Sequence, residues 1–269
     1  MRVDHIQEQG TAPVCEDALL LGRDLYGVFD GATSLDATTF EGGLTGGRLA
    51  ADIACRTFAG GSGTLKRLAE HANDAIGEAM ARRGVDLSRK EALWSTAAVV
   101  VRLEGDRLRW VQIGDSLILI VHADGSHTLP VTDYDHDSEL LLMWKRIARP
   151  GGPTLREALA EELIEVRRGM NRTYGVLNGE PEALGFLRSG TLPLAGIRHL
   201  LLFTDGLFLP KTDPAAPDDF HRFTGIYREG GLPALRRHVR TREQDDPHCL
   251  KYPRVKLHDD MTAIALTFP

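Results

Sequence analysis

The sequence predicts an α+β protein in which antiparallel β-sheets are covered by helices. Two observations support this fold class: strand-like apolar runs follow one another in blocks, and two helical stretches occur as a consecutive pair. The regular strand–helix–strand order of a parallel sheet does not occur. With 269 residues, of which 42% are hydrophobic, the chain is long enough for one large core or two smaller ones.

The N-terminal half predicts a hairpin, a helix pair and a run of strands. Apolar runs on either side of residues 22–24 predict a β-hairpin that ends at Asp30. Apolar residues at helical spacing, stopped by glycine, predict antiparallel helices over residues 45–60 and 64–84. Residues 95–130 contain three apolar runs with turns at 104–106, 114–116 and 123–125, which predict a three-stranded meander.

The C-terminal half mixes helices and strands. Helices are predicted near residues 138–148, 155–168 and 232–240, and strands over 173–177, 198–206 and 261–268. A loop rich in proline and aspartate spans residues 211–220. The chain contains no internal repeat, low-complexity tract or linker, so residues 1–269 are expected to form a single domain.

Composition argues against several classes of function. No run approaches the roughly 20 apolar residues that cross a bilayer, and the N-terminus lacks a secretory pattern, so a cytoplasmic location is expected. The net charge of -6 argues against broad attraction to nucleic acid or anionic membranes. Cys15, Cys55 and Cys249 are far apart and form no CxxC pair, which favours reduced thiols.

Acidic residues recur where apolar strands meet turns. Asp30 and Asp205 each end an apolar run just before a glycine, Asp115 lies in the turn of "WVQIGDS", and Asp259 and Asp260 open the last strand. A single Asp-Gly pair is most simply a turn, because aspartate caps its own turn and glycine accepts positive φ. Four such placements in one chain indicate carboxylates that gather at the rim of a sheet.

Clustered carboxylates of this kind need a compensating partner. Like charges beside a buried strand repel one another unless water, a cation or a hydrogen-bond donor compensates them. Oxygen ligands without histidine or cysteine indicate magnesium, manganese or calcium rather than zinc or copper. No alternating Asp loop ends in Glu, which argues against an EF-hand, so a two-metal centre that activates water is the leading candidate.

Six segments, in order, resemble the metal-dependent protein phosphatases of the PPM (type 2C) family: "CEDALLL", "LYGVFDGATS", "STAAVVV", "WVQIGDSLILI", "LLLFTDGL" and "HDDMTAIAL". Together they span most of the chain. The resemblance implies a four-layer αββα sandwich, with two antiparallel β-sheets flanked by helix pairs and two Mg²⁺ or Mn²⁺ ions at one rim. It also implies hydrolysis of phosphoserine or phosphothreonine in proteins by a water or hydroxide that bridges the two ions.

The resemblance assigns the direct ligands of the two ions. Asp30 would bridge both ions, and the backbone carbonyl of Gly31 would bind one of them. Asp205 and Asp259 would be the other direct ligands. Of the neighbouring pair, Asp259 is favoured as the ligand, whereas Asp260 would support it or form a turn.

Further residues receive indirect roles from the resemblance. Glu16 and Asp17 would position waters on the ions, and Asp115 would help to hold a possible third ion. No protein nucleophile is required, so Cys15 is interpreted as a packed thiol. His258, directly before Asp259, is the candidate general acid, with a surface or supporting role as the alternative.

The sequence departs from the family pattern in two places. The phosphate-binding arginine that many members carry shortly before the early acidic pair is missing, and neither Arg2 nor Arg23 matches it by position. Ala32 replaces the histidine that serves some eukaryotic members as general acid. The resemblance therefore assigns no residue to the binding of the substrate phosphate.

Residues 133–170 occupy the place of the variable flap that the family carries beside its active site. Their apolar residues either pack a short helix or form a docking surface for a substrate or partner. The expected partner is a phosphorylated protein, with no nucleic acid or membrane, and the chain is expected to be a monomer. Two alternatives stay open: a pseudophosphatase that acts as a regulatory binding module, and a hydrolase of a small phosphorylated metabolite.

Overall fold

The computed structural model describes residues 1–35 and 38–269. Within these residues the strands are β1 (Arg2–Glu8), β2 (Ala18–Leu21), β3 (Leu25–Gly31), β4 (Thr96–Glu104), β5 (Arg107–Ile113), β6 (Leu117–His122), β7 (His127–Thr128), β8 (Arg188–Pro193), β9 (Ile197–Phe203) and β10 (Met261–Thr267). They form two five-stranded sheets, with the orders β1-β10-β9-β6-β7 and β2-β3-β4-β5-β8. All pairings between these strands are antiparallel.

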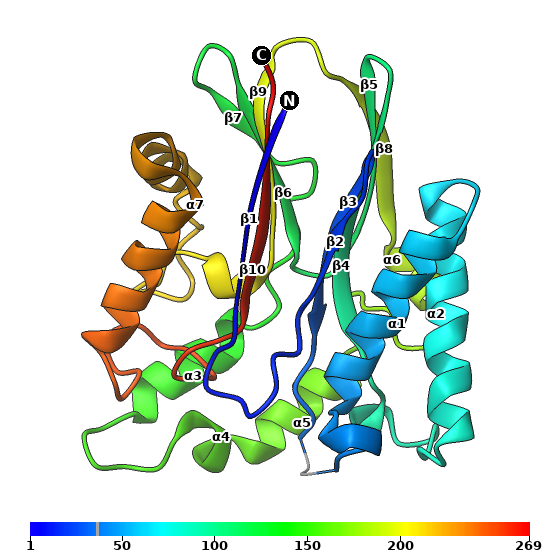
Figure 1. Ribbon diagram of the computed structural model, residues 1–269. Helices are drawn as coiled ribbons and strands as arrows, with labels where there is room; N and C mark the ends of the chain where they lie inside the picture. The colour runs from blue at the N-terminus through cyan, green and yellow to red at the C-terminus, as the bar shows by residue number, and fades with distance from the viewer. Residues whose placement is uncertain (36–37) are drawn as a thin grey trace.

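The helices cover the outer faces and one end of the sheets. They are α1 (Gly46–Gly60), α2 (Leu65–Arg82), α3 (Ser138–Ile147), α4 (Leu155–Ala158), α5 (Ala160–Arg168), α6 (Ala183–Phe186) and α7 (Phe220–Gln244), with 3₁₀ turns η1 (Glu41–Gly43), η2 (Lys90–Ala92) and η3 (Asp205–Leu207). In Figure 1, α1 and α2 lie outside the second sheet, α7 lies outside the first, and α3 to α5 run along the lower end. The α+β class and the four-layer sandwich are confirmed. Gly230 and Gly231 break α7, so this outer layer consists of two segments of one long helix.

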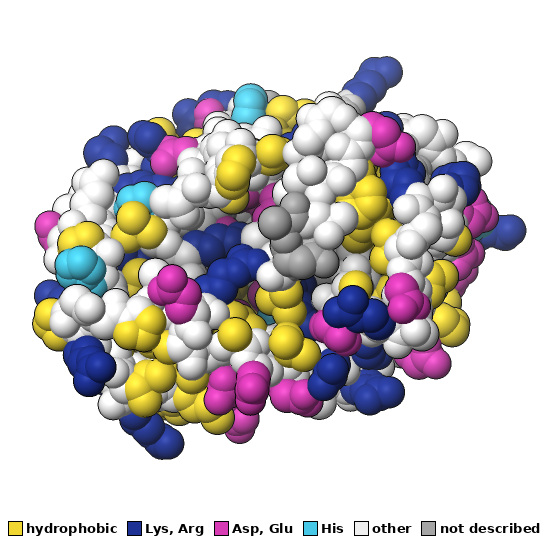
Figure 2. Space-filling model, turned by 90° about the horizontal axis from the view of Figure 1, so that it is seen from below, with side chains coloured by type: hydrophobic (Ala, Val, Ile, Leu, Met, Phe, Trp, Pro, Cys, Tyr) yellow, Lys and Arg dark blue, Asp and Glu magenta, His cyan; other side chains and the backbone are white. Residues whose placement is uncertain are grey.

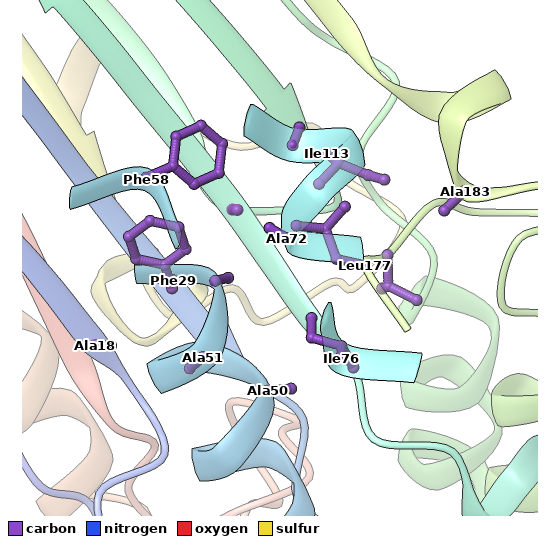
Figure 3. Close-up of a cluster of buried hydrophobic side chains, with 14 of the residues drawn as sticks. Ala18, Phe29, Ala50, Ala51, Phe58, Ala72, Ile76, Ile113, Leu177 and Ala183 are labelled. Carbon is purple, nitrogen blue, oxygen red and sulfur yellow. The ribbon is translucent and has the colours of Figure 1, made fainter. Parts of the chain in front are cut away.

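The helix pair α1 and α2 forms as predicted because each helix has a cap and an apolar face. Thr45 and Thr64 accept hydrogen bonds from backbone N–H groups of the first turn of α1 and α2 respectively. The faces of the two helices pack on the second sheet, where Phe29 of β3 contacts Phe58 of α1 with 5.7 Å between ring centroids (Figure 3). Burial of this apolar surface holds the helix layer to the sheet.

The space between the two sheets holds a second apolar cluster. Val28 and Val99 from one sheet and Ile118 and Leu202 from the other belong to it, and each is at most 1% exposed. The central strands are therefore apolar on both faces, since their outer faces pack on helices.

The predicted three-stranded meander over residues 95–130 is wrong. β4 and β5 pair in the second sheet, whereas β6 crosses to the first sheet and pairs with β9 and β7. The crossing turn contains Gly114 with φ +77°, and a Cβ at this position would lie 2.6 Å from Cβ of Ala97. A strand that is apolar on both faces suits either sheet, so its sequence does not reveal the change of sheet.

Other differences concern weak or interrupted patterns. Residues 173–177 form isolated bridges at Tyr174 and Leu177 rather than a strand. The edge strands β1 and β8 were not predicted, because they are largely exposed and polar. The predicted helix 155–168 is divided at Leu159 into α4 and α5, and the predicted helix 232–240 is the second part of α7, which starts at Phe220.

Strand register brings several strand ends to one end of the sandwich. Met261 at the start of β10 pairs with Glu8, Phe203 at the end of β9 pairs with Leu117, and Gly31 at the end of β3 pairs with Thr96. These ends lie toward α3 to α5, whereas both chain termini lie at the opposite end (Figure 1). Among the described residues, no helix combines the length and apolar character needed to span a membrane.

Candidate active site

A cavity of about 300 Å³ opens at the end of the sandwich where these strand ends meet. Its walls come from the end of β3, the turn before β6, residues 133–141, α5, the chain after β9 and the loop before β10. Figure 2 looks onto this face and shows Lys and Arg side chains within the central hollow, with hydrophobic and acidic side chains around it. The cavity therefore combines both signs of charge with apolar walls.

The structure brings four of the predicted aspartates to this cavity. Asp30 lies at the end of β3, Asp115 lies in the turn between β5 and β6, and Asp205 begins η3 directly after β9. Asp259 lies just before β10 and borders the same cavity, as does Gly31. Residues from opposite ends of the sequence thus meet at one rim, because the antiparallel register places their strand ends together.

Burial and mutual repulsion raise the pKa values of Asp30, Asp115 and Asp205. For Asp30, burial is the largest cause and the charge of Asp205 is the next. For Asp205, burial is followed by the charges of Asp259 and Asp115. Burial also raises the pKa of Asp115, although the nearby His136 opposes the effect. A cluster with these shifts is stabilised by protons or by cations.

One cation already lies among the aspartates. Nζ of Lys256 donates a hydrogen bond to Oδ1 of Asp259 at 2.6 Å. Burial alone would lower the pKa of Lys256, but the charges of Asp259, Asp30 and Asp205 raise it. Sequence reasoning missed this lysine, because nothing in its spacing distinguishes it from a solvated surface lysine.

The neighbouring carboxylates of Asp259 and Asp260 have different surroundings. Asp259 borders the cavity, whereas Asp260 is 3% exposed and accepts two backbone hydrogen bonds. Its donors are the N–H groups of Gly10 at 2.7 Å and Glu16 at 2.6 Å. Asp260 therefore joins the start of β10 to the segment between β1 and β2, which is the supporting role expected for it.

Replacing Asp260 with alanine should lower the free energy of unfolding by about 2 kcal/mol. The substitution leaves the N–H groups of Gly10 and Glu16 without their acceptor, which outweighs the relief of repulsion with Asp17. Urea unfolding of the metal-free protein measures the change. An unchanged midpoint and slope would contradict the role assigned to Asp260.

Glu16 and Asp17 lie behind the cavity and do not line it. The carboxylate of Glu16 accepts hydrogen bonds from the hydroxyls of Thr33 and Thr45, the latter at 2.5 Å. Oδ2 of Asp17 accepts from Oγ1 of Thr204 at 2.9 Å. Burial, with smaller effects from neighbouring carboxylates, raises the pKa of Asp17 to about 7. The action of this pair on the ions through water stays a prediction.

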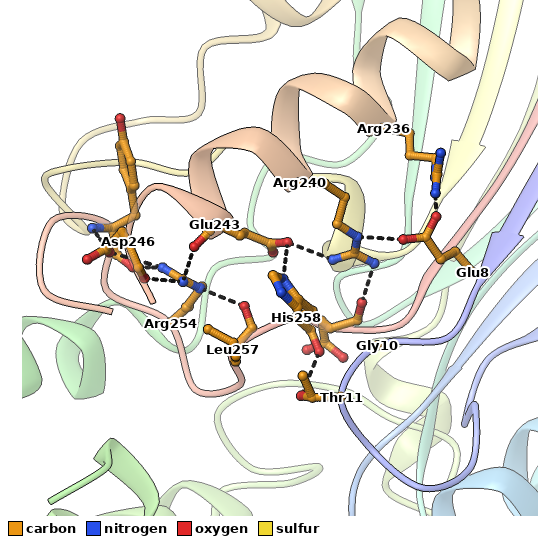
Figure 4. Close-up of polar contacts among 12 residues, drawn as sticks. Glu8, Gly10, Thr11, Arg236, Arg240, Glu243, Asp246, Arg254, Leu257 and His258 are labelled. Carbon is orange, nitrogen blue, oxygen red and sulfur yellow. Dashed lines mark hydrogen bonds and ion pairs between the residues drawn. The ribbon is translucent and has the colours of Figure 1, made fainter. Parts of the chain in front are cut away.

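His258 does not line the cavity but belongs to a polar network on α7 (Figure 4). Its Nδ1 lies 2.8 Å from Oε2 of Glu243, which also accepts a hydrogen bond from Arg240 at 2.7 Å. Arg240 in turn donates to the backbone oxygen of Asp259 at 2.7 Å. This network fastens the backbone of Asp259 to α7. The general-acid role of His258 stays a prediction that the geometry does not favour.

Several cavity residues carried no signal in the sequence. His136 stacks on Tyr174 with 4.0 Å between ring centroids, and its Nε2 lies 3.8 Å from Oδ2 of Asp115. Oη of Tyr134 donates to Oδ2 of Asp218 at 2.6 Å, which joins residues 133–141 to the loop after η3. These residues belong to loops and short helices, where no hydrophobic period marks their position.

The donor groups of the cavity suit a hard divalent cation. Four of the predicted carboxylates border the cavity, and those of Asp30, Asp115 and Asp205 have raised pKa values; carboxylate oxygens are the ligands that Mg²⁺ and Mn²⁺ prefer. Within residues 1–35 and 38–269, no three carboxylate, imidazole or thiol groups stand close enough to hold one ion without rearrangement. A cation that binds Asp259 would compete with Lys256, which donates a hydrogen bond to the same carboxylate.

Solved structures with the same fold include those of bacterial phosphatases. The catalytic domain of the serine/threonine phosphatase PstP, crystallised with two manganese ions, is 17% identical, with a TM-score of 0.58 over 98% of this chain and 96% of that one. PppA of Pseudomonas aeruginosa is 17% identical, with a TM-score of 0.60 and coverage of 99% and 97%. MsPP of Mycobacterium smegmatis, in complex with cacodylate, is 18% identical, with a TM-score of 0.57 and coverage of 100% and 99%. At sequence identities this low, the structural likeness establishes the fold and nothing more.

The sequence itself identifies the family. No sequence among curated proteins matches the chain. A family model described as protein phosphatase 2C matches residues 5–143, which is more than half of the chain and includes Asp30, Gly31 and Asp115. Together with the two-sheet sandwich and the acidic cavity at its rim, this match shows that the chain belongs to the protein phosphatase 2C family.

Proposed function

We propose that this protein hydrolyses phosphoserine and phosphothreonine in phosphorylated proteins with the help of two Mg²⁺ or Mn²⁺ ions. The observation that carries the proposal is the meeting of Asp30, Asp115, Asp205 and Asp259 at one cavity. Repulsion among these carboxylates disfavours the metal-free state, and divalent cations would relieve it. The two manganese ions in the PstP crystal support the same number of ions here.

The proposed direct ligands are those that the family resemblance implies, and all of them line the cavity. Asp30 would contact both ions, with the backbone carbonyl of Gly31, Asp205 and Asp259 completing the direct ligands, and Asp115 would hold a third ion. The bound ions would lower the pKa of water and neutralise charge on the phosphoryl oxygens. The chain itself positions the ligand oxygens at the cavity wall. A hydrogen bond from Arg240 holds the backbone of Asp259 in place.

Residues 133–170 are proposed to act as the flap of this site. Their first part borders the cavity through Tyr134 and His136, and α5 borders it through Leu163 and Val166. The hydrogen bond from Tyr134 to Asp218 ties this segment to the loop after η3. Apolar walls beside charged groups suit a peptide that presents its phosphorylated side chain to the aspartates.

A phosphothreonine peptide tests the proposed function directly. Phosphate release should require Mn²⁺ or Mg²⁺ and should stop when EDTA is added, because the carboxylates alone cannot stabilise the attacking water. A small phosphate ester, assayed in parallel, should be hydrolysed with a lower kcat/KM than the peptide. Preference for the small ester would favour a metabolite hydrolase. Manganese binding without hydrolysis of either substrate would favour a binding module and contradict the proposal.

The contribution of the aspartate cluster to the stability of the metal-free protein should fall as the pH rises from about 4 to about 7. The pKa of Asp17 is raised from 3.8 to about 7, and those of Asp30, Asp115 and Asp205 are also raised, so the folded state binds more protons than the unfolded state in this window. The stability that these groups contribute is full below pH 3.8 and is lost as the pH rises through their folded values.

Manganese should counter this loss, because bound cations replace the protons. Melting temperatures with MnCl₂ or with EDTA should therefore differ more at about pH 7.5 than at about pH 5. Burial lowers the pKa values of His199 and His238, so these residues also make stability depend on pH. Their effect is the same with MnCl₂ and with EDTA, and it cancels when the two melting temperatures are subtracted. An equal manganese effect at both pH values would contradict the prediction.

A further inference from the structure

The cation that binds the substrate phosphate is missing from its usual place in the sequence. No arginine lies shortly before Glu16, and neither Arg2 nor Arg23 borders the cavity. Arg2 instead pairs with Asp4 at 2.8 Å near the start of β1. If the protein hydrolyses phosphate monoesters, any side-chain cation that assists the metal ions in holding the phosphoryl group has to come from elsewhere in the cavity wall.

Most cations of the cavity already have carboxylate partners. Five of them line it: Arg156, Arg167, Lys211, Arg254 and Lys256. Lys256 pairs with Asp259 at 2.6 Å, Lys211 with Asp218 at 3.2 Å and Arg254 with Asp246 at 3.1 Å. Arg156 is exposed and donates to the backbone oxygen of Ser34. Arg167 remains as the half-buried cation for which the described residues provide no carboxylate within salt-bridge distance.

Arg167 is held in place by uncharged groups. Its Nη2 donates to the backbone oxygen of Thr33 at 2.9 Å, and its Nη1 lies 3.4 Å from Oγ of Ser95. Thr33 follows the end of β3, which carries Asp30, and Ser95 directly precedes β4. The guanidinium group is therefore anchored beside the acidic strand ends, although it does not neutralise them.

Arg167 has N–H donors and a positive charge that an anion could use. A guanidinium group has five N–H donors, of which these two contacts use only part. Its positive charge reaches the cavity wall, where it counteracts the raised pKa values of His136 and Tyr174. A half-buried cation without a counter-charge is unfavourable unless an anion binds to it. The planar fork of arginine matches two oxygens of a phosphoryl group.

We propose that Arg167 binds the phosphoryl group of the substrate and takes the place of the missing upstream arginine. This inference rests on the proposed function, because it assigns the phosphate subsite of that same cavity. It places the phosphate contact on α5, within residues 133–170, rather than on the segment before β2. Movement of α5 would then change phosphate affinity directly.

Inorganic phosphate is the probe that tests Arg167. In calorimetric titrations with Mn²⁺ present, Arg167→Met should bind phosphate about 10- to 100-fold more weakly than the wild type. Arg167→Lys, which keeps the charge but loses the fork, should fall between the two, at least about threefold weaker than the wild type. In peptide assays, KM of Arg167→Met should rise more than kcat falls.

Arg168 provides the matched control on the same helix. It pairs with Glu91 at 3.4 Å and Glu165 at 2.7 Å, and it does not line the cavity. Arg168→Met should therefore leave phosphate affinity unchanged. Manganese affinity should be the same in all variants, because Arg167 contacts none of the proposed ligands.

The outcomes separate this inference from the proposed function. Wild-type phosphate affinity in Arg167→Met, or in Arg167→Lys if the first variant does not fold, would overturn the role of Arg167. Absence of phosphate binding by the manganese-loaded wild type would overturn it as well. Phosphate binding that depends on Arg167 without hydrolysis of phosphopeptides would support the subsite and contradict the proposed activity.

Discussion

Asp30→Asn should reduce manganese-dependent hydrolysis of a phosphothreonine peptide by about 1,000-fold, while the metal-free protein becomes more stable. Asp30 is the proposed ligand of both ions, so loss of its charge removes several kcal/mol of stabilisation from the transition state. The opposite effect on stability follows from the raised pKa of Asp30, which burial and the charge of Asp205 cause. Asparagine has a similar shape without the charge and relieves that repulsion.

The two halves of this prediction need separate measurements. Peptide hydrolysis with Mn²⁺ reports the loss of activity, and a melt in EDTA should show an increase of about 2–4 °C. Asp106→Asn, at an exposed turn between β4 and β5, is the control and should change neither value. Activity near that of the wild type in Asp30→Asn would remove Asp30 from the site. A lower melting temperature would contradict the repulsion inferred for the cluster.

Gly206→Ala should destabilise the protein by about 3 kcal/mol or more, because the position has no room for a side chain. A Cβ at Gly206 would lie 1.8 Å from the backbone oxygen of Asp260 and 2.9 Å from its carbonyl carbon. Neither atom belongs to a flexible side chain, so the backbones after β9 and before β10 would have to separate. This separation would also move Asp205 away from Asp259 and weaken manganese binding.

Gly225→Ala is the matched control for this substitution. Gly225 lies inside α7 and is exposed, and a Cβ added there would meet no neighbouring atom within 4 Å. Alanine should therefore stabilise the protein by about 0.5–1 kcal/mol through its greater helix propensity. Urea unfolding measures both variants. Equal stability of Gly206→Ala and the wild type would show that the strand ends can separate without cost.

Much of the fold could be predicted from local patterns. The capped amphipathic stretches after Thr45 and Thr64 predicted α1 and α2, and the paired apolar runs predicted the hairpin of β2 and β3. Patterns failed where the local signal was weak or ambiguous. The edge strands β1 and β8 are too exposed to show a strong apolar signal, and β6 is apolar on both faces, so its change of sheet left no trace.

The residues of the candidate site also divide into those that the sequence pattern predicted and those that it did not. Asp30, Asp115, Asp205 and Asp259 were found from the sequence, because each lies where an apolar strand meets a turn. The remaining charged and aromatic side chains of the cavity come from loops and short helices. In such segments the spacing of residues along the sequence does not indicate which way a side chain points. They include Lys256, His136, Tyr174 and Arg167.

The sequence by itself determined the fold class, the family resemblance and the acidic residues at the strand ends, because these depend on residue type and short-range spacing. The resemblance favoured Asp259 over Asp260 as the ligand, but only the tertiary structure shows which groups hold each of the two carboxylates. Asp259 faces Lys256, whereas Asp260 turns to the N–H groups of Gly10 and Glu16. Contacts across about 250 residues of chain depend on how the strands register in space, which the short-range pattern around two adjacent aspartates does not contain.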